Sequence, residues 1–530
     1  MSEPASAETG RALARAGVVV LAGYGIARAL GWLRVVVIGT TFGAGPELDA
    51  FYAAFRLPDL VFNLVQTGAL TAALVPPIAA LLATGRSQRA WHVASSISVL
   101  VAVVSALFGI VLLVWAPQLV GLLAPGFGPA RTAMTVELVR IMSFGPLILA
   151  LGAVVTSVLN ATGRFAASMA GPISYNIVTI AAAILLPPFI GVRGLAVGTV
   201  LGAAAFLLVQ LVPLWRVGFR FSRHISFREP EARDAAVNLL PRAYGLGVGQ
   251  LQLIIATTLA SGLAFGSVAA FAIAFTVYTI PVLTLAVPLG VVALPALTAR
   301  FARGERGDYA ALFAQTLRLM LFAMLPIAGV GIVLRTELVT ILFNYGKFDV
   351  RAVTMTSNVL LFLLLGLTAD ALNVLLVRAV YARGGTWVPV ASGTAQLAVT
   401  LVLGVALVGP YGLAGIGAAF AAAAWVEAAI LFVSAAMTPG VVDVGLVARG
   451  AAMFLAAAAA ATLVAWGVER VLYVAGLDAG KVAALLQLVL AGSAAIAAYV
   501  LASLALRVPE LPTLTRLLAG ALRGERPAVA

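Results

Sequence analysis

The chain has 530 residues, of which 62% are hydrophobic and only 10% charged, and its mean hydropathy is +1.10. Soluble domains carry about 25% charged residues, so this composition excludes a soluble globular protein and indicates a polytopic membrane protein. The apolar runs are roughly 20 residues or longer, whereas the strands of a membrane barrel are about half that length and alternate in polarity. The predicted fold class is therefore an all-α membrane protein.

The formal net charge is +13, but the basic residues are dispersed through short loops and form no dense run. This distribution argues against nucleic-acid binding and is typical of a topology signal. The absence of cysteine excludes disulfides, thiol chemistry and thiolate metal sites. Because the sequence also lacks a hydrolase or transferase constellation and metal-ligand spacing, we expect neither an enzyme nor a metal site.

Hydropathy, read with Gly, Pro and charge punctuation, predicts about fourteen membrane spans. Their approximate limits are 17–39, 50–82, 93–115, 133–160, 166–187, 193–214, 237–263, 268–298, 311–333, 353–381, 387–408, 411–435, 445–468 and 481–506. With the N-terminus inside, the tails and the loops on that side hold about 20 basic residues, against about 7 outside. An even number of spans then places both termini in the cytoplasm.

Short motifs that contain Gly, Pro or Phe recur at an offset of about 220 residues, which indicates an internal repeat. The pairs are Phe42-Gly43 with Phe265-Gly266, Ala50-Phe51 with Ala270-Phe271, Pro58 with Pro281, Thr84-Gly85 with Arg303-Gly304, Gly126-Phe127 with Lys347-Phe348, and Ala161-Thr162-Gly163-Arg164 with Ala382-Arg383-Gly384-Gly385. An even number of spans per half gives both halves the same orientation. We therefore predict two parallel six-helix repeats around a central cavity, followed by two C-terminal helices.

The predicted division of the chain follows this repeat. An N-terminal lobe covers 1–215, a basic cytoplasmic connector 216–236, a C-terminal lobe 237–435, and the last two helices with a cytoplasmic tail 436–530. The connector interleaves aromatic and basic side chains, which suits a segment at the anionic inner leaflet. A plain linker between lobes explains the segment equally well.

The first two predicted spans carry five charged side chains, namely Arg28, Arg34, Asp49, Arg56 and Asp59. An ionisable group inside a bilayer costs several kcal/mol on insertion scales, so such groups usually face a bundle interior or a wet cavity. Fork-shaped guanidinium groups grip a diphosphate better than any other side chain. We therefore predict that Arg28, Arg34, Asp49 and Arg56 form a substrate site. A structural network of ion pairs is the alternative.

The spacing of these residues separates their roles. Arg28 lies near the middle of its span and is the strongest cavity candidate, whereas Arg34 lies on roughly the opposite side of the helix. Arg34 is close enough in sequence to pair with Asp49 or Asp59 across the hairpin. Arg56 and Asp59 are three residues apart on one helical face, where their charges partly cancel.

The second half of the repeat lacks the equivalent charges. The counterparts of the three arginines fall near Gln250, near Ala256 and at 276–278. Fixed positive charge is thus predicted on the first lobe only. A cavity with one cationic wall suits an amphiphile with an anionic head.

A second candidate site lies in the tenth predicted span, where Asp370 and Asn373 share one helical face. Together with backbone carbonyls they form a candidate site for a coupling cation. A hydrogen-bonded polar pair that locks two helices is an equally good interpretation. Glu427 in the twelfth span is a weaker case of the same kind.

A series of short motifs runs in order along the chain. In the opening they are Arg28-Ala-Leu-Gly31-Trp-Leu-Arg34, Phe42-Gly43-Ala44-Gly45, Asp49-Ala50-Phe51, Phe55-Arg56-Leu57-Pro58, Gly68-Ala69 and Val75-Pro76, and further on they are Ala124-Pro125-Gly126-Phe127, Leu294-Pro295, Tyr345-Gly346-Lys347-Phe348 and Arg378-Ala-Val-Tyr381. With these motifs the chain closely resembles the MurJ/MviN family, bacterial lipid II flippases of the multidrug/oligosaccharidyl-lipid/polysaccharide exporter superfamily. The resemblance implies alternating access, with a lipid-linked disaccharide pentapeptide loaded from the cytoplasmic leaflet of the bacterial inner membrane.

The resemblance also implies which cofactors and partners to expect. Sodium, a proton or the membrane potential would drive transport, without another cofactor. The partners would be the lipid-linked saccharide, anionic membrane lipids and cell-wall synthesis proteins.

The chain departs from the family where charges are expected, because neutral residues stand at Val35, Phe62, Asn63, Gln66 and Thr276. Three alternatives therefore stay open: a flippase for another lipid-linked glycan, a drug exporter, and a non-transporting scaffold for envelope assembly.

Overall fold

The computed structural model describes residues 3–66, 69–222, 225, 247–477 and 480–512, and this part of the chain is helical, with short turns and no strand. The described chain forms two compact units. The first unit contains Met1–Ala269 with Tyr345–Phe348, and the second contains Ala270–Asn344 with Asp349–Ala530. The all-α class predicted from composition is confirmed.

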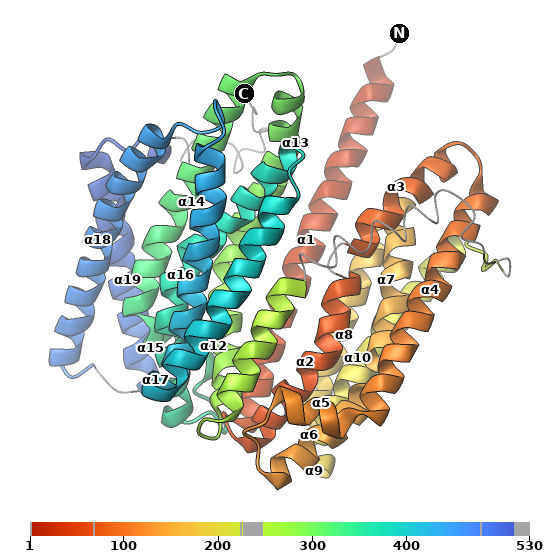
Figure 1. Cartoon of the computed structure of the whole chain (residues 1–530), viewed down its shortest axis with the longest axis horizontal. Helices are drawn as coiled ribbons and strands as arrows, with labels where there is room; N and C mark the ends of the chain where they lie inside the picture. Colours follow the sequence, from red (N-terminus) through yellow and green to blue (C-terminus); the bar gives the residue numbers. More distant parts are fainter. Residues whose placement is uncertain (1–2, 67–68, 223–224, 226–246, 478–479, 513–530) are drawn as a thin grey trace. The chain divides into compact units, whose positions relative to one another are not determined.

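The first unit consists of long helices that run side by side with shorter helices at their ends (Figure 1). They are α1 (Glu3–Phe42), α2 (Pro46–Gln66), α3 (Ala69–Ala83), α4 (Ser87–Val114), α5 (Ala116–Leu123), α6 (Pro129–Met142), α7 (Gly145–Ala161), α8 (Phe165–Leu185), α9 (Pro187–Ile190) and α10 (Arg193–Arg216). Residues 247–261 form one more short apolar helix. These helices position the arginines predicted to bind substrate.

Small residues bring the helices of the first unit together. A Cβ atom on Gly198 of α10 would lie 2.5 Å from the Ala182 Cβ of α8, and one on Gly202 would lie 2.6 Å from the Thr179 Oγ1. Helices in a membrane associate through this close packing, because lipid gives them no hydrophobic driving force. Glycine at these positions is therefore required by the helix contact.

The second unit contains α12 (Ser267–Pro281), whose first three residues belong to the first unit, and the remaining helices to the C-terminal end. They are the π-helix η1 (Val282–Ala286), α13 (Val287–Ala302), α14 (Arg306–Val333), α15 (Arg335–Phe343), α16 (Val350–Ala382), α17 (Trp387–Ala436), α18 (Val444–Val474) and α19 (Gly480–Ala505). The rings of Phe322, Phe454 and Tyr499 meet between α14, α18 and α19, with centroids 5.0 to 5.6 Å apart. The two helices outside the repeat thus pack on α14.

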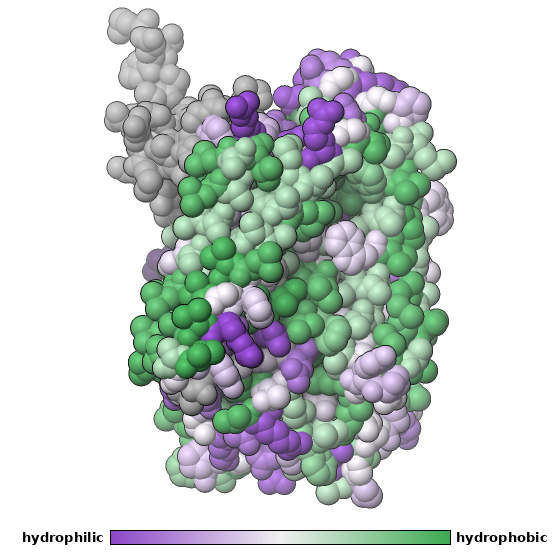
Figure 2. Space-filling view, turned by 90° about the vertical axis from the view of Figure 1, so that its left-hand side faces the viewer, coloured by the Kyte–Doolittle hydropathy of each residue, from purple (hydrophilic) through white to green (hydrophobic). Residues whose placement is uncertain are grey.

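Exposed apolar side chains cover α18 and α19, among them Leu455, Leu463, Val471, Val482 and Leu501. Figure 2 shows a face of the molecule on which apolar side chains dominate the middle and hydrophilic ones gather toward the ends. A soluble protein would bury such side chains, whereas lipid tails solvate them at no cost. The chain is therefore a multi-pass membrane protein.

Eleven helices of the described part are long and apolar enough to cross a membrane. They cover all but two of the predicted spans, because α17 contains two of them on either side of a non-helical break at Gly412. The other two spans, 50–82 and 237–263, correspond to α2 with α3 and to the short helix 247–261. The count of fourteen is not confirmed. Most of the predicted connector 216–236 lies outside the described residues, and the lobe boundaries and orientation stay predictions.

The backbone repeats where the sequence does. Five pairs of left-handed glycines stand about 220 residues apart, and each ends a helix or turns the chain at equivalent places. The pairs are Gly43 with Gly266, Gly85 with Gly304, Gly163 with Gly384, Gly191 with Gly412, and Gly218 with Gly440. Three of these pairs belong to the recurring motifs that predicted the repeat from the sequence.

Candidate functional site

The arginines of α1 differ in their surroundings. Arg28 is exposed, whereas the half-buried Arg34 guanidinium lies 5.2 Å from the ring centroid of Tyr175 on α8. A cation over a tyrosine face is stabilised by the ring quadrupole without being neutralised. Of the two predicted partners of Arg34, Asp49 binds elsewhere, whereas the charge of Arg34 acts on Asp59.

Arg56 lies in the middle of α2 and is only 8% exposed. Its Nε donates a hydrogen bond to the Thr257 Oγ1, at 3.2 Å, in the short helix 247–261. A neutral hydroxyl orients the guanidinium but leaves its charge in place. The opposite charge of Asp59, one turn further along α2, acts on Arg56 as their spacing predicts.

Two small cavities lie inside the first unit against these charges. One is lined by Arg34 and Tyr52, the other by Asp59 and Tyr175, and both reach Phe55 and Thr199. Their walls come from α1, α2, α8 and α10, together with α6 and α7. Arg34 and Asp59 therefore line internal space within this unit, whereas Arg28, Asp49 and Arg56 do not line these two cavities.

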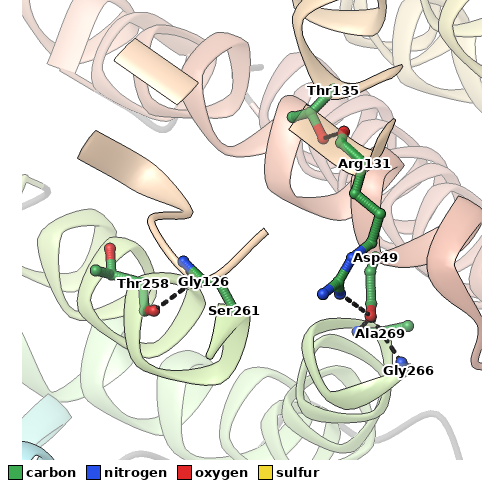
Figure 3. A network of polar contacts seen from close by, with 8 residues as sticks. All are labelled: Asp49, Gly126, Arg131, Thr135, Thr258, Ser261, Gly266 and Ala269. Carbon is green, nitrogen blue, oxygen red and sulfur yellow. Dashed lines mark hydrogen bonds and ion pairs between the residues drawn. The ribbon is translucent and has the colours of Figure 1, made fainter. Parts of the chain in front are cut away.

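Asp49, in the first turn of α2, is 1% exposed and binds the start of α12. Its Oδ2 accepts a hydrogen bond from the Gly266 N–H at 2.7 Å, and its Oδ1 accepts one from the Ala269 N–H at 2.9 Å (Figure 3). A carboxylate at a helix N-terminus satisfies free N–H groups and interacts favourably with the helix dipole. These contacts assign Asp49 a positioning role, and its predicted part in substrate binding stays a prediction.

Arg131 of α6 is a residue that the sequence analysis missed. Its Nη1 lies 3.6 Å from the Asp49 Oδ2, and its guanidinium is sandwiched between the rings of Phe127 and Phe265, at 4.4 and 4.5 Å. Figure 3 shows the side chains of Arg131 and Asp49 pointing toward each other. The sequence could have identified Arg131 by its position, because it is one of the few basic residues on the predicted outer side.

Glycine residues allow four loops of the first unit to pack closely near Asp49. The loops are 43–45, 124–128, 262–266 and 345–348. A Cβ atom on Gly43 would lie 2.3 Å from the Lys347 carbonyl oxygen, and one on Gly126 would lie 2.3 Å from the Gly262 Cα. The Lys347 N–H donates to the Thr40 carbonyl oxygen at 2.9 Å. Only glycine permits this backbone approach. Segments from both sequence repeats are thus joined at the predicted outer end of this unit.

The structure places the second candidate site inside the second unit. The Tyr278 hydroxyl of α12 donates a hydrogen bond to the Asp370 Oδ2 of α16. The Asn373 Nδ2 donates to the Ala424 carbonyl oxygen at 3.1 Å and to the Glu427 Oε2 at 3.0 Å, both on α17. The two residues predicted from their spacing therefore each bind a different neighbouring helix.

Neutral side chains occupy described positions where the family resemblance leads us to expect charge. The Asn63 Nδ2 donates to the Asp59 carbonyl oxygen at 3.0 Å, and the Thr276 Oγ1 donates to the Ala272 carbonyl oxygen at 2.9 Å, each within its own helix. The side chains of Phe62 and Gln66 lie outside the described part. The arginines named above are therefore the cations to test first.

Similar structures agree with this architecture. A solved structure of a lipid II flippase MurJ in an inward closed conformation aligns with a TM-score of 0.76 and 19% identity, covering 92% of this chain and 98% of that one. An inward-facing multidrug resistance MATE family transporter of the MOP superfamily aligns with a TM-score of 0.60 and 17% identity, covering 79% and 97%. At these identities the likeness shows the fold.

Sequence comparison shows the family. The family described as lipid II flippase MurJ matches residues 38–488. The lipid II flippase MurJ of Burkholderia cenocepacia is 30% identical over 417 residues, which are 77% of this chain and 80% of that protein. The chain belongs to the lipid II flippase MurJ family.

Proposed function

We propose that the chain moves lipid II, a polyprenyl-diphosphate-linked saccharide, from the inner to the outer leaflet by alternating access. Family membership supports the substrate class, and the chain acts as a transporter rather than an enzyme. The observation that carries the proposal is the excess of positive charge on α1 and α2, where Asp59 is the only acid that acts on both Arg34 and Arg56 among the described residues and Asp49 pairs with Arg131 instead. Arg56 is buried against the neutral Thr257, and Arg28 is exposed on an apolar helix.

Binding of a diphosphate depends on replacing the water around it. A diphosphate must lose hydration to enter a protein, and guanidinium groups replace the lost hydrogen bonds in a two-pronged geometry. Arg28 is exposed and meets the ligand without first breaking a contact, whereas Arg34 and Arg56 are held by Tyr175 and Thr257. Asp49 would not bind the diphosphate directly, because its carboxylate carries the same sign of charge.

The proposed membrane location, orientation and partners follow from the same transport function. The protein lies in the bacterial inner membrane with both termini in the cytoplasm, and its connector meets anionic lipids of the inner leaflet. Cell-wall synthesis proteins receive the product. Single cysteines at Gly45 and Gln88 test the orientation, because only the cysteine at position 45 should react with an impermeant thiol reagent added outside.

A flippase for another lipid-linked glycan is the second candidate, because the neutral side chains of Asn63 and Thr276 stand where the family resemblance predicts charge. The diphosphate site would be unchanged and the saccharide different. Mass spectrometry of lipids that copurify with the protein separates the two candidates. Neither a drug exporter nor a scaffold is favoured by the family assignment.

The deciding experiment measures flipping of fluorescent lipid II in proteoliposomes together with lipid binding by native mass spectrometry. Arg28→Ala should lose both, while Arg193→Ala, which removes an exposed ion pair with Glu137 in the same unit, should lose neither. Equal flipping and equal lipid II binding by the two variants would remove the anion-binding role of Arg28.

A further inference from the structure

Asn373 brings two carboxyl groups of the second unit into one cluster, because it follows Asp370 by three residues on one face of α16 and donates a hydrogen bond to Glu427 at 3.0 Å. Glu427 of α17 is 9% exposed and Asp370 of α16 is half-buried, and the charge of Asp370 acts on Glu427. Neither takes part in an ion pair of the described residues. Two ionised carboxylates are not stable together in this apolar setting, so the pair requires a proton or a bound cation.

Each carboxylate is already held by a neutral hydrogen-bond donor. Tyr278, 4% exposed, donates its hydroxyl hydrogen to Asp370, and Asn373 donates an amide hydrogen to Glu427 at 3.0 Å. A proton needs only one of the remaining carboxylate lone pairs, whereas a metal ion needs several oxygen ligands at once. The contacts therefore favour a proton over sodium.

Asn373 supplies an independent sign of a missing partner. The side chain is 6% exposed, and its Oδ1 has no hydrogen-bond donor. The amide orientation is fixed, because both neighbours of its nitrogen, the Ala424 carbonyl and the Glu427 carboxylate, are acceptors. A buried acceptor without a donor is costly, and an acidic O–H in the same cluster would satisfy it.

We propose that Asp370 and Glu427 share one exchangeable proton, and that this pair is the coupling site of the second unit. Proton binding stands on the contacts above, whereas the coupling role rests on the proposed transport function. Protonation removes one negative charge from the pair and gives the acid an O–H to donate. The helices that carry these groups, α12, α16 and α17, are the elements whose contacts change with the proton.

The other titratable groups near the pair are few. Tyr381 of α16 interacts with Glu427. Four further ionisable groups on α14, α16 and the turn after α16 have hydrogen-bond partners of their own: Arg378 donates to the Val374 carbonyl, Arg383 to the Ala379 carbonyl and Thr438, Tyr309 to the Ala379 carbonyl, and Arg318 to Glu510. The proton is thus assigned to the carboxyl pair and not to a neighbouring base.

Infrared difference spectroscopy of the purified protein in lipid nanodiscs tests the site without any substrate. Wild type should show a carboxylic-acid carbonyl band that disappears as pH rises. Asp370→Asn and Glu427→Gln should each lower the pH at which the remaining acid deprotonates, because the like charge is gone. The double variant should lose the band, and Tyr278→Phe should shift its frequency by removing a hydrogen bond.

Asp308→Asn is the matched control, since Asp308 is exposed in the first turn of α14 in the same unit, and its spectrum should equal wild type. Persistence of the band in the double variant would overturn the site, as would a band that responds to added sodium at fixed pH. A normal band in a protein that fails to bind lipid II would contradict the proposed transport function and leave the proton site standing.

Discussion

The two units hold charges of opposite sign in the same manner. In the first unit Arg56 has the hydroxyl of Thr257 as its partner, and in the second Asp370 has the hydroxyl of Tyr278. Arg56 and Tyr278 fall close to equivalent positions of the repeat, so the repeat carries a cation in one copy and a phenol in the other. A neutral partner fixes the direction of a charged group without cancelling it, and at Arg56 the opposite charge of Asp59 cancels only part of the positive charge that Arg34 and Arg56 carry together.

A buried ion pair of the second unit differs from these charges, because both of its partners are charged. In the second unit the Arg318 Nε lies 2.5 Å from the Glu510 Oε1, and Arg318 also donates to the Leu446 carbonyl oxygen at 3.0 Å. Both partners are buried and cancel each other, so this pair joins α14 to α18 and to the segment after α19. We expect neutralised charges to act on stability and uncancelled charges to act on transport.

The largest expected effect is on stability, at the cancelled pair. Glu510→Gln leaves the buried Arg318 cation without its counter-ion, and breaking such a pair costs about 3–5 kcal/mol. The midpoint of thermal unfolding in detergent should fall sharply. Glu137→Gln breaks an exposed pair with Arg193 as the control and should cost about 0–1 kcal/mol. Equal losses in the two variants would contradict the assignment of Arg318 and Glu510 to the core.

Arg28→Ala should have the next largest effect, on lipid II binding and flipping. Loss of a charge-assisted hydrogen bond to the ligand costs about 1.5–3 kcal/mol, which is about a 10- to 100-fold loss of affinity. Arg28→Lys keeps the charge but not the two-pronged geometry and should be partly active. The measurement is flipping per folded molecule, with the unfolding midpoint followed in parallel. Activity that falls only in proportion to folded protein would make Arg28 structural.

Asp49→Asn should cost less, about 1–2 kcal/mol of stability, because asparagine keeps part of the cap but loses its charge toward Arg131. The control is Asp443→Asn in the second unit, where the carboxylate caps α18 locally through the Leu446 N–H at 2.9 Å and is exposed. Its unfolding midpoint should fall by less than half as much. A larger loss at Asp443 would show that the contact of Asp49 with Gly266 is not a major link.

The charges and the repeat could be predicted because both are written in residue type and spacing. Arg28, Arg56, Asp370 and Asn373 stand out in an apolar sequence, and Gly43 recurs as Gly266. Their partners could not be predicted. Asp49 binds backbone N–H groups 217 and 220 residues away, and every residue but proline has such a group.

The pairing of Asn373 with Glu427 was missed for a related reason. The two residues lie on different predicted spans, 54 positions apart, and a sequence gives no rotation of one helix against another. The contact of Arg131 with Phe265 joins two segments that are far apart in the sequence, whereas Phe127 is a near neighbour. Contacts between elements are therefore what the structure adds to the sequence.

The smallest expected effect is that of Thr257→Val, which tests whether Arg56 binds the lipid or only holds two helices together. Thr257→Val removes the hydroxyl that Arg56 binds at 3.2 Å and keeps the side-chain shape, so the ligand-free protein should lose about 1 kcal/mol of stability. If Arg56 turns to the diphosphate when lipid II binds, the bound protein loses less. The rise in unfolding midpoint on adding lipid II should then be larger in Thr257→Val than in wild type. An identical rise in both proteins would mean that Arg56 keeps Thr257 in the bound state and holds the helices together instead of the lipid.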